Sequence, residues 1–287
     1  MTDGFNLFYR RWKAVGEVQR SIICLHGMGI HSEFFRVIGE ELAEDGAEVY
    51  ALDARGFGNS TEQGLPRGDS KNLRRSLQDI DEAVEFVRKN YPAKKIFMFG
   101  HSLGATETLW YAANHPASLN GIILAAPAIA MRIKSPLKDI IRLLFLRAFA
   151  PKTMWNWVEG TPEQLKETEV FTTLVKRIMP SDPLLPKEFS VRYLFSLFAL
   201  VGGKALKNAS KIRQPTLVIQ GDADGNVVPS GARKLLEKLG SEDKSLRLLP
   251  QANHFFYGAL TPKLSSDDNP DRACEVIDTV SDWLRIH

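Results

Sequence analysis

The sequence predicts an α/β fold, a mostly parallel sheet flanked by helices, on the strength of three observations. Short apolar runs bounded by glycine, proline or charged residues are typical of buried strands. The segments between them carry apolar residues three and four positions apart, as amphipathic helices do. The regular alternation of the two kinds of segment predicts a parallel sheet with helices on both faces.

Each element follows from its own stretch of sequence. Parallel strands are predicted over residues 22–25, 49–52, 96–99, 122–125, 217–219 and 246–249. Helices are predicted over residues 32–45, 71–90, 103–114, 229–239 and 271–286. Residues 5–13 precede the alternation, and we expect them to add an antiparallel edge strand.

One long interval lacks the strand pattern. Residues 128–214 instead offer helical or irregular segments, at 137–149, 163–179 and 189–206. We predict a helical cap (lid) of residues 128–214, inserted after the sixth strand into a core of residues 1–127 and 215–287. Ligands of an open parallel sheet bind beyond the carboxyl ends of its strands, so the cap should cover that edge.

Composition excludes several classes of protein. The chain has 287 residues, of which 44% are hydrophobic and 25% charged, enough for one large packed core with an insertion. A net charge of +3 without dense Lys/Arg tracts argues against a nucleic-acid partner. The two cysteines, Cys24 and Cys274, are far apart, which favours a reducing compartment. With neither a secretory signal pattern nor a long apolar run, we expect a cytoplasmic location, with peripheral membrane association left open.

The sequence Gly100-His101-Ser102-Leu103-Gly104 directly follows the apolar run at residues 96–99. A serine between two glycines at a strand-to-helix turn is the pattern of a nucleophile elbow, which presents the hydroxyl at the tip of the turn. The pattern alone also occurs by chance. Its catalytic interpretation depends on the other groups that the chain supplies.

An oxyanion hole needs two backbone N–H groups, and the sequence offers both. Leu25-His26-Gly27-Met28-Gly29 follows the first buried strand, where the fold places one donor, and the second belongs to the residue after the nucleophile. We therefore expect Met28 and Leu103 to donate. The alternative for His26-Gly27 is an ordinary tight turn.

A serine hydroxyl is a poor nucleophile at neutral pH, so an imidazole must accept its proton and a carboxylate must orient that imidazole. His254 follows a predicted strand and is the predicted base. Asp224 is the predicted carboxylate, with Asp222 as the alternative, because Asp222 directly follows its strand and is suited to capping the turn. The chain order of serine, acid and histidine agrees with this fold.

These residues together resemble the α/β-hydrolase family, and within it the serine hydrolases related to monoacylglycerol lipases and lysophospholipases. The resemblance extends over most of the chain, through the motifs Phe8-Tyr9-Arg10-Arg11-Trp12, His26-Gly27-Met28-Gly29-Ile30-His31-Ser32, Asp53-Ala54-Arg55-Gly56-Phe57-Gly58-Asn59-Ser60, Gly100-His101-Ser102-Leu103-Gly104, Gly221-Asp222-Ala223-Asp224 and Asn253-His254. It implies ester hydrolysis through an acyl-enzyme, without a cofactor or metal, with Ser102, Asp224 and His254 as the triad. The chain departs from the family at Ile30, where such lipases often carry an acid.

Other residues receive simpler interpretations. His31, His115 and His287 lack partners at metal-ligand spacing, so no metal site is predicted. His101 is expected to pack or hydrogen-bond at the elbow rather than act as a second base. Trp155 and Trp157 are suited equally to lining an acyl pocket and to packing the cap.

The predicted helix at residues 137–149 is apolar almost all round, which indicates burial on several sides or contact with an apolar partner. Between residues 130 and 152, six basic residues and one acid give a local charge of +5. Contact with anionic lipid and an ordinary roof helix both fit this pattern. The basic residues are Arg132, Lys134, Lys138, Arg142, Arg147 and Lys152.

We therefore predict a carboxylic ester hydrolase whose small-molecule substrate is a single-chain lipid ester, of monoacylglycerol or lysophospholipid type. A peptidase or a carbon–carbon bond hydrolase on the same scaffold is the alternative enzyme. A peptidase should carry acids in the cap to hold a substrate amine, and Glu159, Glu163, Glu167 and Glu169 leave that open. A non-catalytic carrier of an apolar ligand is the alternative outside catalysis.

Overall fold

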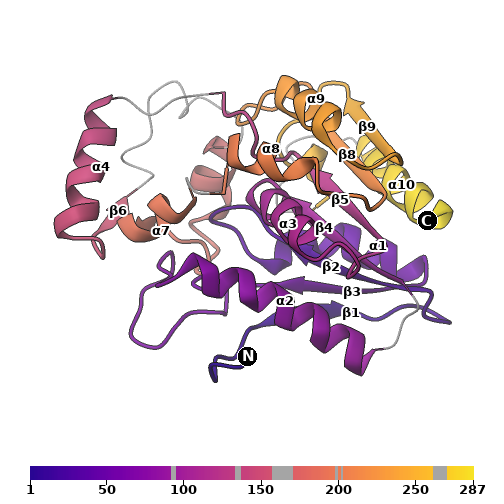
Figure 1. The fold of residues 1–287 in the computed structure, drawn as a ribbon, viewed down its shortest axis with the longest axis horizontal. Coiled ribbons are helices and arrows are strands. Elements are labelled where there is room, and N and C mark those ends of the chain that lie inside the picture. The colour runs from indigo at the N-terminus through magenta and orange to yellow at the C-terminus, as the bar shows by residue number, and fades with distance from the viewer. Residues whose placement is uncertain (92–94, 133–136, 157–170, 198–199, 202, 261–269) are drawn as a thin grey trace.

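A seven-stranded sheet forms the centre of the computed structural model, which describes residues 1–91, 95–132, 137–156, 171–197, 200–201, 203–260 and 270–287 (Figure 1). The strand order is β1-β3-β2-β4-β5-β8-β9, and every pairing is parallel except that of β1 with β3. The predicted mostly parallel sheet with one antiparallel edge is confirmed. The strands are β1 (Tyr9–Trp12), β2 (Arg20–Leu25), β3 (Ala47–Leu52), β4 (Lys95–His101), β5 (Gly121–Ala125), β8 (Thr216–Gly221) and β9 (Lys244–Leu249).

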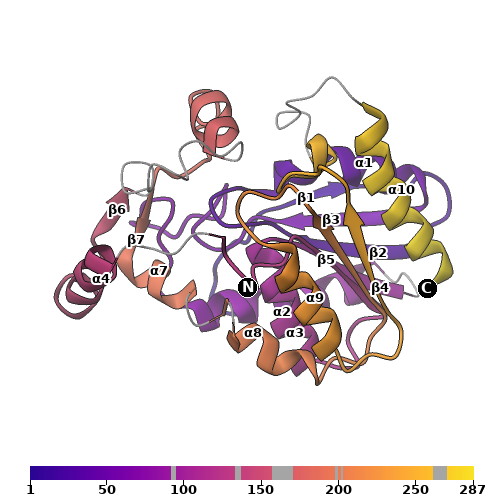
Figure 2. The same cartoon turned by 90° about the horizontal axis from the view of Figure 1, so that it is seen from above.

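Helices cover both faces of the sheet. Figure 2 shows α1 and α10 on one face and α2, α3, α8 (Gly203–Ala209) and α9 on the other. The predicted helix at 103–114 has the observed bounds of α3, and the other core helices differ from prediction by a few residues at their ends. The core helices are η1 (Ser32–Phe35, a 3-10 turn), α1 (Arg36–Glu44), α2 (Leu73–Asn90), α3 (Leu103–Asn114), α9 (Pro229–Lys238), η3 (Phe256–Gly258, a 3-10 turn) and α10 (Pro270–Ile286).

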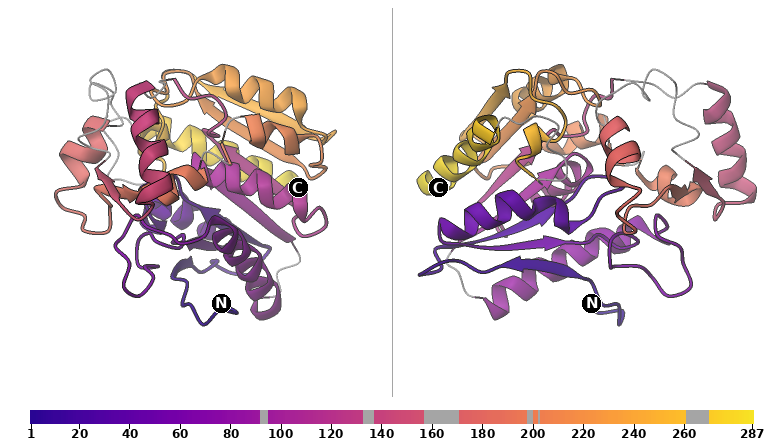
Figure 3. Two further views of the ribbon diagram at one scale, coloured as in Figure 1. Left: turned by 60° about the vertical axis from the view of Figure 1, so that its left-hand side comes forward. Right: turned by 180° about the vertical axis from the view of Figure 1, so that it is seen from behind.

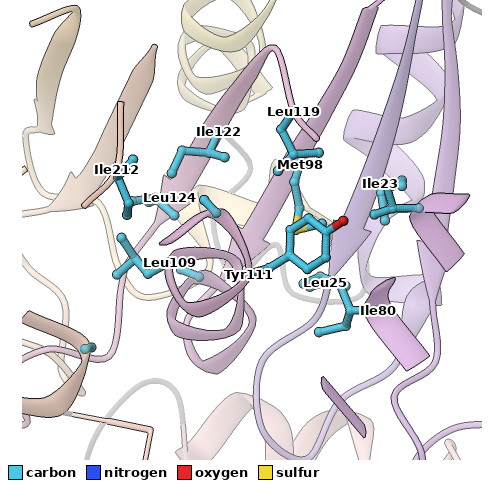
Figure 4. Packing of buried hydrophobic residues seen from close by; sticks show 14 of the residues in the cluster. Ile23, Leu25, Ile80, Met98, Leu109, Tyr111, Leu119, Ile122, Leu124 and Ile212 are labelled. Carbon is cyan, nitrogen blue, oxygen red and sulfur yellow. The ribbon is translucent and has the colours of Figure 1, made fainter. Parts of the chain in front are cut away.

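Two apolar cores lie on opposite sides of the sheet because successive side chains of a strand point to opposite faces. In β2, which is buried along its whole length, Ile22 and Cys24 pack in the core beneath α1 and α10. Ile23 and Leu25 pack in the other core, beneath α2 and α3 (Figure 4). Burial on both faces explains why the central strands are continuous apolar runs rather than alternating ones.

The chain between β5 and β8, which we call the inserted segment, lies outside this sheet. Two expectations about it were wrong. It follows the fifth strand rather than the sixth, because the N-terminal region contributes the single strand β1 before β2. Within the residues that the structure describes, its elements are α4 (Leu137–Phe149), β6 (Met154–Asn156), η2 (Thr172–Ile178, a π-helical stretch), β7 (Glu188–Ser190), α7 (Val191–Leu197) and α8 (Gly203–Ala209).

The second error is that the inserted segment is not wholly helical. Strands β6 and β7 pair antiparallel, with Trp155 opposite Phe189, so the predicted helix at 189–206 begins only after Ser190. Strands of three residues are too short to show an alternating pattern, so no periodicity predicts them. The predicted helix at 163–179 lies partly outside the described residues.

Helix α4 matches its predicted bounds and stands at the end of the molecule farthest from the sheet (Figures 1 and 3). Its described contacts with other elements are mainly with α7. Among the helices of the described ranges, none combines the length and apolarity needed to cross a bilayer.

A buried ion pair joins α7 to the core. The Arg192 guanidinium donates to both oxygens of Asp69, at 2.8 and 2.6 Å, and Asp69 is 2% exposed. The Ser190 amide donates to the carbonyl of Gly68 beside it. These bonds fix β7 and the start of α7 against the loop that follows β3.

A buried acid lies on the core side of α3. Glu107 lines a small cavity together with His26, Arg55 and Asp79, and its side chain is largely buried. Burial disfavours the carboxylate and raises the pKa of Glu107 to about 8. The folded protein therefore holds Glu107 in its neutral form at neutral pH.

We expect Arg192→Met to lower the free energy of unfolding by about 3 kcal/mol, because it leaves the buried Asp69 carboxylate without its cation. Urea denaturation measures this. Arg285→Met, which removes the more exposed pair with Asp45, is the matched control and should change stability much less, because water screens an ion pair at the surface. Equal effects of the two substitutions would contradict the anchoring role of Arg192.

Glu107→Gln should change how stability depends on pH. Between the ordinary pKa of 4.5 and about 8, the unfolded chain has lost a proton that the folded chain keeps, so Glu107 makes stability fall as pH rises through this window. The free energy of unfolding of the variant should therefore rise relative to that of the parent by about 1.4 kcal/mol for each pH unit across the window. Urea denaturation from pH 5 to 8 tests this, with the exposed Glu40→Gln as control. Identical slopes for parent and variant would contradict the buried neutral acid.

Candidate active site

Ser102 occupies a strained turn between β4 and α3. Its φ of 55° and ψ of −112° lie in a region that residues other than glycine rarely adopt. The turn is also too tight for side chains at its flanks: a Cβ on Gly100 would lie 2.3 Å from the Gly104 carbonyl oxygen, and one on Gly104 would lie 2.1 Å from that of Leu25. The glycines are therefore required by the turn, as the sequence pattern predicts.

His254 and Asp224 come together at the carboxyl edge of the sheet. His254 follows β9, Asp224 follows β8, and the Nδ1 of His254 lies 2.8 Å from Oδ2 of Asp224. Both side chains are buried. Because a carboxylate can only accept, Nδ1 carries the proton and Nε2 is left with its lone pair.

The surroundings of Asp224 favour its ionised form. Burial alone would raise its pKa, but His254 and the amides of Asn226 and Val227 outweigh burial and hold the pKa of Asp224 below its usual value. Those two amides donate to Oδ1 at 2.8 and 3.0 Å. The alternative acid, Asp222, instead accepts a hydrogen bond from the Gln251 amide at 2.6 Å. Asp222 thus orders the loop before His254.

His101 connects the Ser102 turn with the His254 loop. Its Nε2 lies 2.9 Å from the His254 carbonyl oxygen, and the two imidazole centroids are 4.9 Å apart. Burial, with a contribution from His254, lowers the pKa of His101 to about 3, so the ring is neutral and donates through Nε2–H. Of the two roles expected for His101, the structure supplies both ring packing and a hydrogen bond.

The loop after β2, which carries Met28, touches the Ser102 turn. A Cβ on Gly27 would lie 3.1 Å from Cβ of Ser102, so the close approach leaves little room for a side chain. Leu103 is the first residue of α3, and the first N–H groups of a helix have no acceptor within the helix. The predicted donors, Met28 and Leu103, thus lie on the two segments that meet beside Ser102.

His26 has a role that motif reading did not find. Its Nε2 accepts from the Ala54 amide at 3.0 Å, and its Nδ1 donates to the Gly27 carbonyl oxygen at 2.7 Å. Burial lowers the pKa of His26, which keeps the ring neutral for this pair of bonds. His26 therefore joins the loop after β2 to the loop after β3, and a sequence shows no signal for such a contact between distant loops.

The inserted segment packs against both sides of this site. Ile30, Phe34 and Phe255 form one apolar cluster with Leu174, Ile178, Met179 and Leu185 of the inserted segment. Because Ile30 is buried in this cluster, an apolar residue suits its position. A second cluster surrounds Leu103 and contains Phe57, Phe189, Tyr193 and Leu197.

The remaining histidines hold structural contacts with carboxylates. His31 lies 3.0 Å from Asp182, His115 lies 3.3 Å from Asp81, and His287 lies 2.8 Å from Asp243. Trp155 lies under the Arg142 guanidinium, 4.9 Å from its ring centroid. Trp157, Lys134 and the four glutamates at positions 159, 163, 167 and 169 lie outside the described residues.

The chain is similar to known hydrolases over most of its length. The family model described as "Serine aminopeptidase, S33" matches residues 16–258. Human "Monoglyceride lipase" is 27% identical over 260 residues, which cover 90% of this chain and 82% of the human protein. "Monoacylglycerol lipase" of Mycolicibacterium smegmatis is 24% identical over 287 residues, covering 99% and 94% of the two chains.

A solved structure extends the similarity to the fold. The crystal structure of Paleococcus ferrophilus monoacylglycerol lipase superposes with a TM-score of 0.74 at 25% identity, covering 97% of this chain and 99% of that one. The chain therefore has the α/β-hydrolase fold and belongs to the family described as Serine aminopeptidase, S33, as an ester-cleaving serine hydrolase.

Proposed function

We propose that this protein hydrolyses lipid esters with a single acyl chain, of monoacylglycerol or lysophospholipid type, through an acyl-enzyme on Ser102. The observation that carries the proposal is the buried hydrogen bond between His254 and Asp224, held beside the Ser102 turn by His101. The monoglyceride and monoacylglycerol lipases among the relatives support the substrate class.

The proposed reaction assigns one role to each group. Ser102 Oγ attacks the ester carbonyl carbon while Nε2 of His254 takes the hydroxyl proton, and the imidazolium then returns that proton to the departing alcohol. Water, deprotonated by the same nitrogen, then attacks the acyl carbonyl carbon. The bond to Ser102 Oγ breaks, the imidazolium returns its proton to Oγ, and the fatty acid is released. Asp224 holds the tautomer of His254 and stabilises its cation.

Met28 and Leu103 are the proposed donors to the oxyanion. Both act through backbone N–H groups, so side-chain changes at either position should affect the chemistry only through packing. Loss of one donor of this kind typically slows turnover by about 10²–10³.

We propose that the inserted segment is the cap predicted for residues 128–214, over a core of residues 1–127 and 215–287. Its apolar side chains contact Leu103 and the residue after His254. An acyl chain that enters beside Ser102 would meet these apolar surfaces, whereas a charged substrate would lose its hydration there.

A peptidase and a carbon–carbon bond hydrolase remain the alternative reactions, and a carrier the alternative without catalysis. The family description names an aminopeptidase, while its curated relatives named above are lipases. Product analysis separates these possibilities, because a carrier releases no alcohol and a peptidase prefers aminoacyl amides.

The decisive experiment is a panel of esters from acetyl to palmitoyl, with monoacylglycerol, lysophosphatidylcholine and aminoacyl amides. We expect the single-chain lipid esters to be hydrolysed best and a chromogenic ester to give a stoichiometric burst. Ser102→Ala should lose the burst and its labelling by a fluorophosphonate probe, with turnover lower by about 10³ or more.

Asp222→Asn is the matched control, because Asp222 bonds to the loop backbone rather than to His254. It should keep most of the turnover, whereas Asp224→Asn should lose about 10⁴. Labelling and hydrolysis by Ser102→Ala at the parent's rate would refute the proposed nucleophile. Best activity on aminoacyl amides would refute the proposed substrate class.

We further propose that α4 docks the protein on an anionic lipid surface from a cytoplasmic location. Five apolar side chains recur on its exposed side at positions 137, 141, 144, 145 and 149, each more than half exposed. The charges of Lys138, Arg142 and Arg147 on the same helix complement anionic headgroups, each adding about 1 kcal/mol near the surface. The helix is too short to span a bilayer but suited to lie in its interface.

Ile141→Ser with Phe145→Ser should lower binding to phosphatidylglycerol vesicles by about 10-fold or more, because two apolar side chains no longer leave water. Vesicle sedimentation measures the binding, and hydrolysis of a short soluble ester should stay unchanged. Ile286→Ser, which alters an exposed apolar residue at the end of α10, is the control. Unchanged sedimentation of the double variant would rule α4 out as the docking element.

A further inference from the structure

We propose that the hydrogen bond between His31 and Asp182 fixes the backbone that carries the Met28 N–H, which makes both residues positioning residues for the reaction. The inference rests on the proposed function, because it assumes that Met28 donates to the oxyanion. It assigns to the inserted segment a part in building the site, in addition to covering it.

The bond itself is well defined. His31 Nε2 lies 3.0 Å from Asp182 Oδ2, and the two side chains are 1% and 5% exposed. The Glu33 amide donates to His31 Nδ1 at 3.3 Å, so the proton of the neutral ring is on Nε2 and points to the carboxylate. Asp182 Oδ1 accepts from the Leu184 amide at 3.0 Å, which fixes the carboxylate in turn.

The bond can affect the Met28 N–H because His31 lies close to Met28 in the chain. Only Gly29 and Ile30 separate His31 from Met28. Gly29 has a φ of 76°, and glycine restricts the backbone less than any other residue. On the near side of Met28, His26 is bonded to Ala54. On the far side, the Ser32 amide donates to Asp53 at 2.7 Å, directly after His31. Met28 thus lies between two fixed points, and His31 belongs to the second.

The contacts of Ile30 and Phe34 with the inserted segment are apolar, and such contacts do not define one direction. Ile30 and Phe34 flank His31 in sequence and pack against Leu174, Ile178, Met179 and Leu185. Apolar packing stabilises such a cluster without selecting one alignment of its parts. A hydrogen bond between a buried imidazole and a buried carboxylate does select one, at a cost in desolvation. His31 and Asp182 therefore set the alignment of the inserted segment with the Met28 loop.

The same cluster includes Phe255, which directly follows His254. A displacement of the segment around Asp182 would therefore reach the site from two sides, through Ile30 and through Phe255. We expect loss of the His31–Asp182 bond to lower the rate of the chemical step more than the affinity for substrate.

The test compares His31→Leu, which removes the donor, with His31→Gln, which keeps an N–H in reach of Asp182. Active sites are counted by a fluorophosphonate burst, and kcat and KM are measured per titrated site on a chromogenic butyrate. We expect His31→Leu to lower kcat about 10- to 100-fold with KM changed by less than about threefold, as for a small misplacement of a catalytic group. His31→Gln should recover most of the loss.

A double variant separates pairing from folding. If the two side chains act as one unit, His31→Leu with Asp182→Leu should be no slower than either single change, because the second removes an already broken bond. His115→Leu is the matched control, since His115 pairs with Asp81 at the surface, and its kcat should equal the parent's. If His31→Leu does not fold, His31→Gln and Asp182→Asn carry the same comparison.

Different results would overturn this inference and the proposed function. If the parent shows a burst, and every folded His31 and Asp182 variant has a kcat per titrated site within twofold of the parent's, this inference alone is overturned. A parent without any burst that depends on Ser102 would overturn the proposed function and this inference with it.

Discussion

The structure depends on the close approach of backbones at the turn between β4 and α3. Gly100 and Gly104 leave room for carbonyl groups where any Cβ would clash, and this room lets Ser102 keep its strained conformation. The strain is sustained because β4 is paired on both sides, with β2 and with β5, and the Ser102 amide donates to the Ala125 carbonyl. The rigid centre of the sheet thus holds a side chain where an isolated turn would relax.

Neutral buried histidines connect the loops around this turn. His101 joins the turn to the His254 loop, and His26 joins the loop after β2 to the loop after β3. Each ring uses its N–H as a donor to a backbone carbonyl. Burial, which keeps these rings uncharged, also makes their hydrogen bonds stronger than bonds exposed to water. A neutral ring beside His254 adds no positive charge that would oppose formation of the His254 cation.

Much of this architecture can be predicted from the sequence because local patterns determine it. Strand and helix periodicity specify the sheet and its covering helices, and the spacing of Gly100, Ser102 and Gly104 specifies the elbow. The order of Asp224 and His254 along the chain follows from their places after successive strands. Contacts between distant segments could not be predicted: the β6–β7 pairing, the Ala54 contact of His26, and the meeting of His31 with Asp182. Each is decided by tertiary packing, which leaves no periodic signal in either partner.

The position of α4 has a consequence for how such a chain can change. Its described contacts are mainly with α7, and most of its apolar side chains face outward, so few of its residues are held by the core. Substitutions there carry little penalty in folding, whereas those near β4 carry a large one. Evolution can therefore change the residues of α4, and with them the surface that the protein presents to its surroundings, without disturbing the turn that carries Ser102.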